Sequence, residues 1–165
     1  MIKLKETLLL LAGSEVDFVI VGGVAATLHG SAFQTFDLDI CYSRDRGNLE
    51  RLVGVLSPFH PTLRGAPSGL PPKWDPRTLR NGLNFTLTKD LGDLDLLGEI
   101  AGIGSYQAVK AKSRSVEMYA LKFSILSLSG LIEAKRAAGR DKDLRALPEL
   151  EALLEATEGD AAGRQ

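Results

Sequence analysis

Two glycines and two aspartates, separated by thirteen residues, form the most informative pattern in the chain. Gly22 and Gly23 follow the apolar run 17–21, and Asp37 and Asp39 flank a leucine further on. The glycines are expected to end a strand and open a helix, where free backbone N–H groups let a phosphate approach. Because side chains alternate along a strand, the two aspartates should project from one face.

Two carboxylates side by side repel each other unless a cation lies between them. Mg²⁺ suits this position, with Mn²⁺ as an alternative, because it is a hard ion that binds carboxylate and phosphate oxygens together. The pattern therefore predicts a two-metal site beside a phosphate cradle, which is the equipment for in-line phosphoryl chemistry.

A third carboxylate is expected from a second D-L-D sequence on another predicted strand. Asp93 and Asp95 would share a face of that strand, so periodicity alone does not choose between them. In a two-metal site the third carboxylate commonly binds the metal that activates the attacking hydroxyl, and it can help to take the proton.

These residues resemble the signature of the nucleotidyltransferase superfamily, which is a strand, Gly-Gly or Gly-Ser, then Asp-x-Asp and a later third Asp. The chain is more closely similar to small bacterial nucleotidyltransferases of the AbiEii/MenT type, many of which belong to toxin–antitoxin pairs. Three stretches carry this resemblance: VGGVAATLHG at 21–30, TFDLDI at 35–40 and LIEAKRAAGRDKDL at 131–144. It covers about residues 15–150.

The resemblance implies a metal-dependent transferase that moves an NMP from an NTP to an acceptor hydroxyl and releases pyrophosphate. It favours Asp95 over Asp93 as the third carboxylate, and it implies that Lys135 and Asp143 belong to the site. The expected catalytic and metal-binding residues are Asp37, Asp39 and Asp95. The expected nucleotide-binding residues are Gly22, Gly23, Lys135, Arg136, Arg140 and Asp143. A cognate antitoxin is an expected partner.

The charges are distributed unevenly although the net charge is only −1. From Lys110 to Arg145 there are nine Lys or Arg against four Asp or Glu, a local +5, and the remainder carries −6. Lys135, Arg136, Arg140 and Lys142 would lie on or just after one helix, where they could neutralise a triphosphate or an RNA backbone. We therefore expect a polyanionic acceptor such as a tRNA 3′ end. A protein hydroxyl or a small molecule is the alternative acceptor, and two ordinary solvated faces are the alternative interpretation of the charge.

One departure from the resemblance keeps a second function open. Many relatives carry a basic residue shortly before the position of Thr35, where this chain has Phe33 and Gln34. The alternative is a catalytically silent nucleotidyltransferase scaffold, which would bind nucleotide or a partner without releasing pyrophosphate. A glycosyltransferase that uses D-x-D is a more distant alternative, since such domains usually need a longer chain and lack the double glycine.

The elements that must position these residues indicate an α+β fold, with a small, mixed, twisted sheet flanked by helices and a C-terminal helical segment. Strands are expected at 17–21, 37–42, 84–88 and 93–97, with one or two more within 115–125. Helices are expected at 3–12 and 24–28, after Asp45, at 106–112, 127–138 and 141–147, and from Pro148 onward. The segment 57–82 holds six of the seven prolines and predicts a long loop, in which Trp74 could stack a base or anchor the loop.

Length and composition fit one domain. We expect that domain at 1–156, with a core at about 15–125, a helical segment at about 127–156 and a flexible tail at 157–165. The single cysteine, Cys41, excludes an intramolecular disulfide. The longest apolar run covers residues 8–12, far short of the ~20 that span a bilayer. A soluble cytoplasmic protein without a membrane partner is expected.

Overall fold

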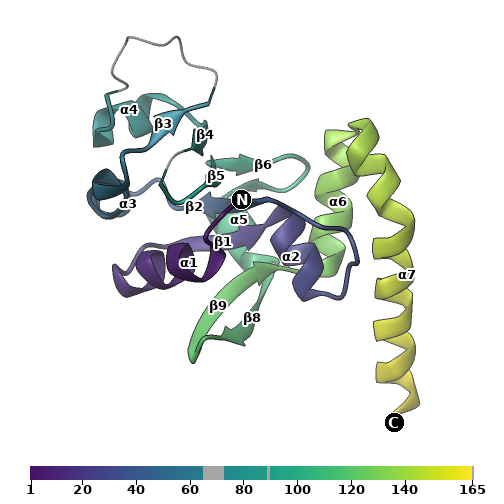
Figure 1. Ribbon diagram of the computed structural model, residues 1–165. Coiled ribbons are helices and arrows are strands. Elements are labelled where there is room, and N and C mark those ends of the chain that lie inside the picture. The colour runs from purple at the N-terminus through teal and green to yellow at the C-terminus, as the bar shows by residue number, and fades with distance from the viewer. Residues whose placement is uncertain (65–72, 89, 165) are drawn as a thin grey trace.

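The computed structural model describes residues 1–64, 73–88 and 90–164. A seven-stranded mixed sheet lies at its centre, with the strand order β3-β4-β5-β2-β1-β9-β8 (Figure 1). Its strands are β1 (Phe18–Val21), β2 (Asp37–Tyr42), β3 (Thr62–Leu63), β4 (Asn84–Thr88), β5 (Asp93–Leu97), β8 (Ser113–Met118) and β9 (Leu121–Leu126). A separate hairpin is formed by β6 (Glu99–Ile100) and β7 (Gly104–Ser105).

Helices flank this sheet, and α6 and α7 pack against each other at one side of it (Figure 1). The helices are α1 (Leu4–Gly13), α2 (Gly22–Leu28), α3 (Arg46–Leu56), α4 (Pro76–Asn81), α5 (Tyr106–Ala111), α6 (Leu128–Ala138) and α7 (Asp141–Gly163). The predicted α+β class, with its mixed sheet and C-terminal helices, is confirmed. Within the described ranges, no helix combines the length and the apolar character that crossing a membrane requires.

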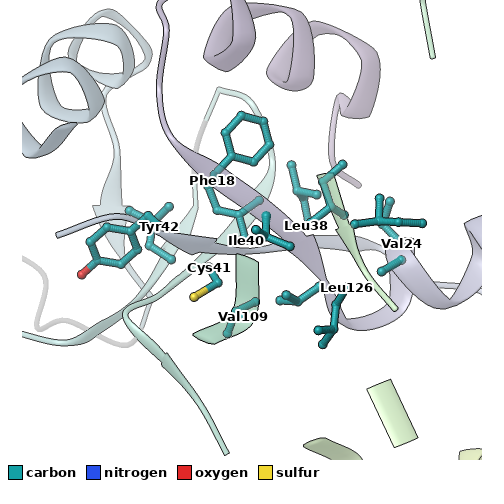
Figure 2. Close-up of a cluster of buried hydrophobic side chains, with 14 of the residues drawn as sticks. Phe18, Val24, Leu38, Ile40, Cys41, Tyr42, Val109 and Leu126 are labelled. Atoms are coloured by element: carbon teal, nitrogen blue, oxygen red, sulfur yellow. The ribbon is translucent and has the colours of Figure 1, made fainter. Parts of the chain in front are cut away.

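The alternating sequence of β2 explains how the sheet separates its core from its polar face. Leu38 and Ile40 are completely buried on one face, and Asp37 and Asp39 lie on the other. Further along β2 the carboxylate face also closes, since Cys41 points toward Val109 of α5 (Figure 2). The polar face is therefore covered by α5 beyond the aspartates, and burial raises the pKa of the Cys41 thiol to about 12, as suits an inert core cysteine.

The proline-rich segment is not one long loop. It contains a 3₁₀ turn at Ser57–Phe59, strand β3 and helix α4, while residues 65–72 lie outside the described part of the chain. Trp74 donates its indole N–H to the carbonyl of Val53 at 3.1 Å. This bond supports the loop-anchor interpretation of Trp74 rather than base stacking.

The C-terminal helices also differ from the prediction, because 141–147 and the segment after Pro148 form one continuous helix, α7. A proline inside a helix removes one N–H and costs about 3 kcal/mol. Here Leu147, Leu150 and Leu153 pack on the core on both sides of it, so tertiary contacts outweigh that cost. The helix runs to Gly163, so most of the tail expected at 157–165 is helical.

Helix α6 begins and ends as its sequence predicts. The Ser127 hydroxyl accepts a hydrogen bond from the Gly130 N–H at 3.1 Å, which is an N-cap. Gly139 follows the helix with φ of 63°, a conformation that a residue without a side chain adopts at low cost. These two ends fix the position of Lys135 in the last turn of α6.

We expect Ser127→Ala to lower the free energy of unfolding by about 1 kcal/mol, since it removes this capping bond. Ser105→Ala is the matched control, because Ser105 occupies the N-cap of α5 without a side-chain capping bond. Urea denaturation should show a larger loss for Ser127→Ala, and equal losses would contradict the capping role.

Candidate active site

The register between two parallel strands assembles the candidate site. Strands β2 and β5 pair so that Asp39 lies beside Asp95 and Asp37 lies beside Asp93. One carboxylate oxygen from each of Asp37, Asp39 and Asp95 lies within 4.8 Å of the others. The structure therefore groups Asp95 with the first pair of aspartates, whereas Asp93 stands outside this group.

The electrostatics of this group are unfavourable without a cation. Burial, together with the charges of Asp37 and Asp95, raises the pKa of Asp39 to about 7. The Oδ1 atom of Asp95 is buried and accepts no hydrogen bond from the described residues. A buried acceptor without a donor costs about 1–3 kcal/mol, and more when it is charged. Three convergent carboxylates of this kind fit a hard divalent cation.

The two glycines are required by close packing, Gly22 against Asp39 and Gly23 against Thr35. Gly22 has φ of 62°, and a Cβ there would lie 2.1 Å from Oδ2 of Asp39. A Cβ on Gly23 would lie 2.7 Å from the side-chain oxygen of Thr35. The absence of side chains at this turn thus lets its backbone lie directly against Asp39 and Thr35.

Thr35 supports the site but was not singled out as a functional residue from the sequence. Its hydroxyl donates to Oδ1 of Asp37 at 2.7 Å, which fixes the orientation of that carboxylate. The signal in the sequence was a threonine two residues before an aspartate, a spacing at which hydroxyls commonly form local hydrogen bonds.

Helix α7 holds the loop that leads to Thr35. Glu149 accepts a hydrogen bond from the Ser31 hydroxyl at 2.6 Å and one from the Ala32 N–H at 2.7 Å. Both bonds lower the pKa of Glu149, and the bond from Ala32 has the larger effect. The pairs are more than 100 residues apart in sequence, so no local pattern could have predicted them.

Three of the four expected polar nucleotide-binding residues lie together. Asp143 is 2% exposed, and it accepts hydrogen bonds from Nε of Arg140 at 2.6 Å and from Nζ of Lys135 at 3.5 Å. Burial alone would raise the pKa of Asp143, but Arg140 and Lys135 lower it. The structure places Arg136 elsewhere, in an ion pair with Glu151 of α7.

The positive charges of Arg140 and Lys142 interact with Asp39 of the carboxylate group. The hydrogen bond to Asp143 raises the pKa of Arg140, and the negative charge of Asp39 raises it further. The positive charge of Lys142 in turn lowers the pKa of Asp39, against the larger effects that raise it. Cations on and before α7 are therefore close enough to act on a ligand at the carboxylates.

Arg64, which follows β3, is a second feature that the sequence did not reveal. Its Nη2 lies 3.3 Å from Oδ2 of Asp93 and 3.9 Å from Oδ1 of Asp95, and the longer distance exceeds that of a hydrogen bond. Asp93 thus forms an ion pair with Arg64 and does not belong to the group of Asp37, Asp39 and Asp95.

Comparison with known proteins identifies the fold. No family model and no curated protein matches the sequence. A Thermotoga maritima protein provisionally assigned as a nucleotidyltransferase is 19% identical with a TM-score of 0.55, over 90% of this chain and 94% of that one. A lincosamide antibiotic adenylyltransferase with lincomycin bound is 15% identical with a TM-score of 0.60, over 91% and 95%.

A third solved structure agrees. A nucleotidyltransferase-like antigenic protein from Paracoccidioides brasiliensis is 16% identical with a TM-score of 0.54, over 89% of this chain and 73% of that one. At such low identities the likeness establishes the fold, which is that of nucleotidyltransferases, and the chemistry has to be argued from the site.

Burial of Asp39 beside two other carboxylates predicts a specific pH dependence of stability. Because the pKa of Asp39 is raised to about 7, the folded protein holds a proton there that the unfolded chain has lost above about pH 4. In metal-free buffer, wild-type stability should therefore fall relative to that of Asp39→Asn as pH rises from about 4 to 7. The difference should approach about 4 kcal/mol at most. If the difference in free energy of unfolding between wild type and Asp39→Asn stays constant from about pH 4 to 7, the raised pKa of Asp39 is contradicted.

The packing of Gly22 predicts a loss of both stability and metal binding. Gly22→Ala places a methyl group against Asp39 at a positive φ, and we expect a cost of about 1–3 kcal/mol and weaker Mn²⁺ binding. Gly54→Ala is the control, since its Cβ would meet nothing within 4 Å. Denaturation and Mn²⁺ titration of both variants provide the check, and a neutral Gly22→Ala would refute the close approach.

Proposed function

We propose that this protein is a metal-dependent nucleotidyltransferase, which moves an NMP from an NTP to an acceptor hydroxyl with release of pyrophosphate. One observation carries the proposal: Asp37, Asp39 and Asp95 converge beside the side-chain-free turn at Gly22 and Gly23. The nucleotidyltransferase fold of the neighbours supports it.

The carboxylates would hold two Mg²⁺ ions, with Mn²⁺ as a substitute. Asp37, Asp39 and Asp95 would together hold these ions. When bound, the ions neutralise the triphosphate and acidify the acceptor hydroxyl. Such a cation would give a ligand partner to Oδ1 of Asp95, which is buried and accepts no hydrogen bond from the described residues.

The remaining roles belong to the chain itself. Gly22 and Gly23 would hold the β- and γ-phosphates through the backbone N–H groups of their turn, and Arg140 and Lys142 would supply positive charge for the leaving pyrophosphate. The acceptor oxygen bonds to the α-phosphorus as the bond to the bridging oxygen breaks. Asp95 would take the hydroxyl proton.

The test is pyrophosphate release from labelled NTPs in the presence of Mg²⁺, with total RNA and protein as acceptors. Asp39→Asn should lower turnover at least about 100-fold while the protein stays folded. Asp160→Asn, an exposed aspartate near the end of α7, is the matched control and should be unchanged. Nucleotide binding without pyrophosphate release would instead support the catalytically silent scaffold.

For the acceptor we propose RNA, with a tRNA 3′ end as the concrete case. The metal site is acidic, so an RNA end requires nearby cations, and Lys142 acts on Asp39 while forming no ion pair with the residues that the structure describes. One structural neighbour is a lincosamide adenylyltransferase, so a small-molecule hydroxyl is the competing acceptor. The AbiEii/MenT type and a cognate antitoxin stay predictions from the sequence.

Charge reversal at Lys142 should weaken tRNA binding more than reversal at Lys122. Lys122 lies on β9 three residues before Ile125, which pairs with Ile20, so it lies toward the end of the sheet away from the glycine turn. Filter binding against salt should also lose roughly 0.7–0.9 in log–log slope per phosphate contact removed. tRNA affinity that is absent at low salt, or equal in Lys142→Glu and Lys122→Glu, would contradict an RNA acceptor.

A further inference from the structure

Arg64 lies in the same row of the sheet as the carboxylates. Its backbone N–H donates to the carbonyl of Thr86 on β4 at 2.9 Å. Thr86 lies opposite Asp95 of β5, and Asp95 lies opposite Asp39 of β2. Residues in such a row project from one face and are about 5 Å apart from strand to strand.

The neighbours of Arg64 confirm which face it shares. Leu63 and Leu87, one position along their strands, line an apolar pocket together with Phe85. Since side chains alternate, Arg64 and Thr86 project to the opposite face, which is that of the aspartates. The long Arg64 side chain reaches across the small Thr86 to the carboxylates.

The contacts of Arg64 are divided between two aspartates. Its Nη2 is within hydrogen-bond distance of Asp93 at 3.3 Å, and it approaches the undonated Oδ1 of Asp95 to 3.9 Å. The Arg64 side chain is 45% exposed, so the guanidinium can move into solvent without disturbing the core. Asp93 is 39% exposed and has no place among the grouped carboxylates.

We propose that Arg64 is an internal counter-cation of the carboxylate site, held by Asp93, that opposes metal binding at Asp95 and so limits metal affinity. The inference rests on the proposed function in requiring a divalent cation at Asp37, Asp39 and Asp95. A guanidinium beside Asp95 offsets repulsion in the metal-free protein, and the same positive charge repels an arriving cation. Arg64 and Asp93 are thus positioning residues that act through Asp95.

The test measures Mn²⁺ affinity by calorimetry or by EPR of free Mn²⁺, without nucleotide, so that the readout is independent of turnover. Arg64→Gln should bind Mn²⁺ about 3- to 10-fold more tightly, because a charge about 4–6 Å from the ion is removed at a partly exposed position. Arg64→Lys keeps the charge and should stay within about twofold of wild type. Arg51→Gln is the matched control, since Arg51 pairs with Asp17 through a side chain that is 41% exposed.

The role of Asp93 is tested by a double-mutant cycle. Asp93→Asn should weaken Mn²⁺ binding in the wild-type background, because Arg64 then pairs with Asp95 alone. The same substitution should weaken binding much less in the Arg64→Gln background. Equal weakening in both backgrounds would show that Asp93 acts on the metal independently of Arg64 and overturn its role as a holder of Arg64. Circular dichroism of each variant establishes that it is folded.

The outcomes separate the two proposals. Mn²⁺ binding that is lost in Asp39→Asn but unchanged or weakened in Arg64→Gln would overturn the counter-cation and leave the transferase proposal intact. Absence of Mn²⁺ binding by the wild-type protein would overturn both. Tighter binding in Arg64→Gln alone, with Arg51→Gln unchanged, is the expected result.

Discussion

Repulsion among three carboxylates on two adjacent strands is the constraint on which the rest of this structure depends. Burial of Leu38 and Ile40 fixes one face of β2 in the core and so commits Asp37 and Asp39 to the other face. The parallel register with β5 then brings Asp95 alongside. Hydrophobic packing thereby holds the charges together, and burial, followed by the charges of Asp37 and Asp95, raises the pKa of Asp39.

The surrounding residues offset this cost from several directions. Thr35 donates to Asp37, Arg64 approaches Asp95, and Lys142 lowers the pKa of Asp39. Helix α7 contributes twice, since it carries Asp143, which fixes Arg140, and Glu149, which holds the loop before Asp37. The C-terminal helix is thus part of the site as well as a cover for the sheet.

The sequence predicted the features that depend on local periodicity. The D-L-D alternation predicted two strands with carboxylates on one face, and the serine and glycine that bound α6 predicted its ends. Periodicity did not decide between Asp93 and Asp95, because both occupy one face. Only the pairing of β5 with β2, which sets Asp95 beside Asp39, distinguishes them. The break at Pro148 was predicted wrongly because leucine packing outweighs local propensity. The spacing predicted Arg136 in the nucleotide-binding group with Arg140, whereas Arg136 forms an ion pair with Glu151 of α7. Such long-range pairs leave no local signal.

The central claim is that Asp37, Asp39 and Asp95 form one divalent-cation site. The most direct test is an anomalous difference map from crystals soaked in Mn²⁺ with a non-hydrolysable NTP. We expect Mn²⁺ peaks among these three carboxylates, beside the turn at Gly22 and with Asp93 outside the coordination sphere. No peak at the site, or a peak ligated by Asp93 in place of Asp95, would contradict it.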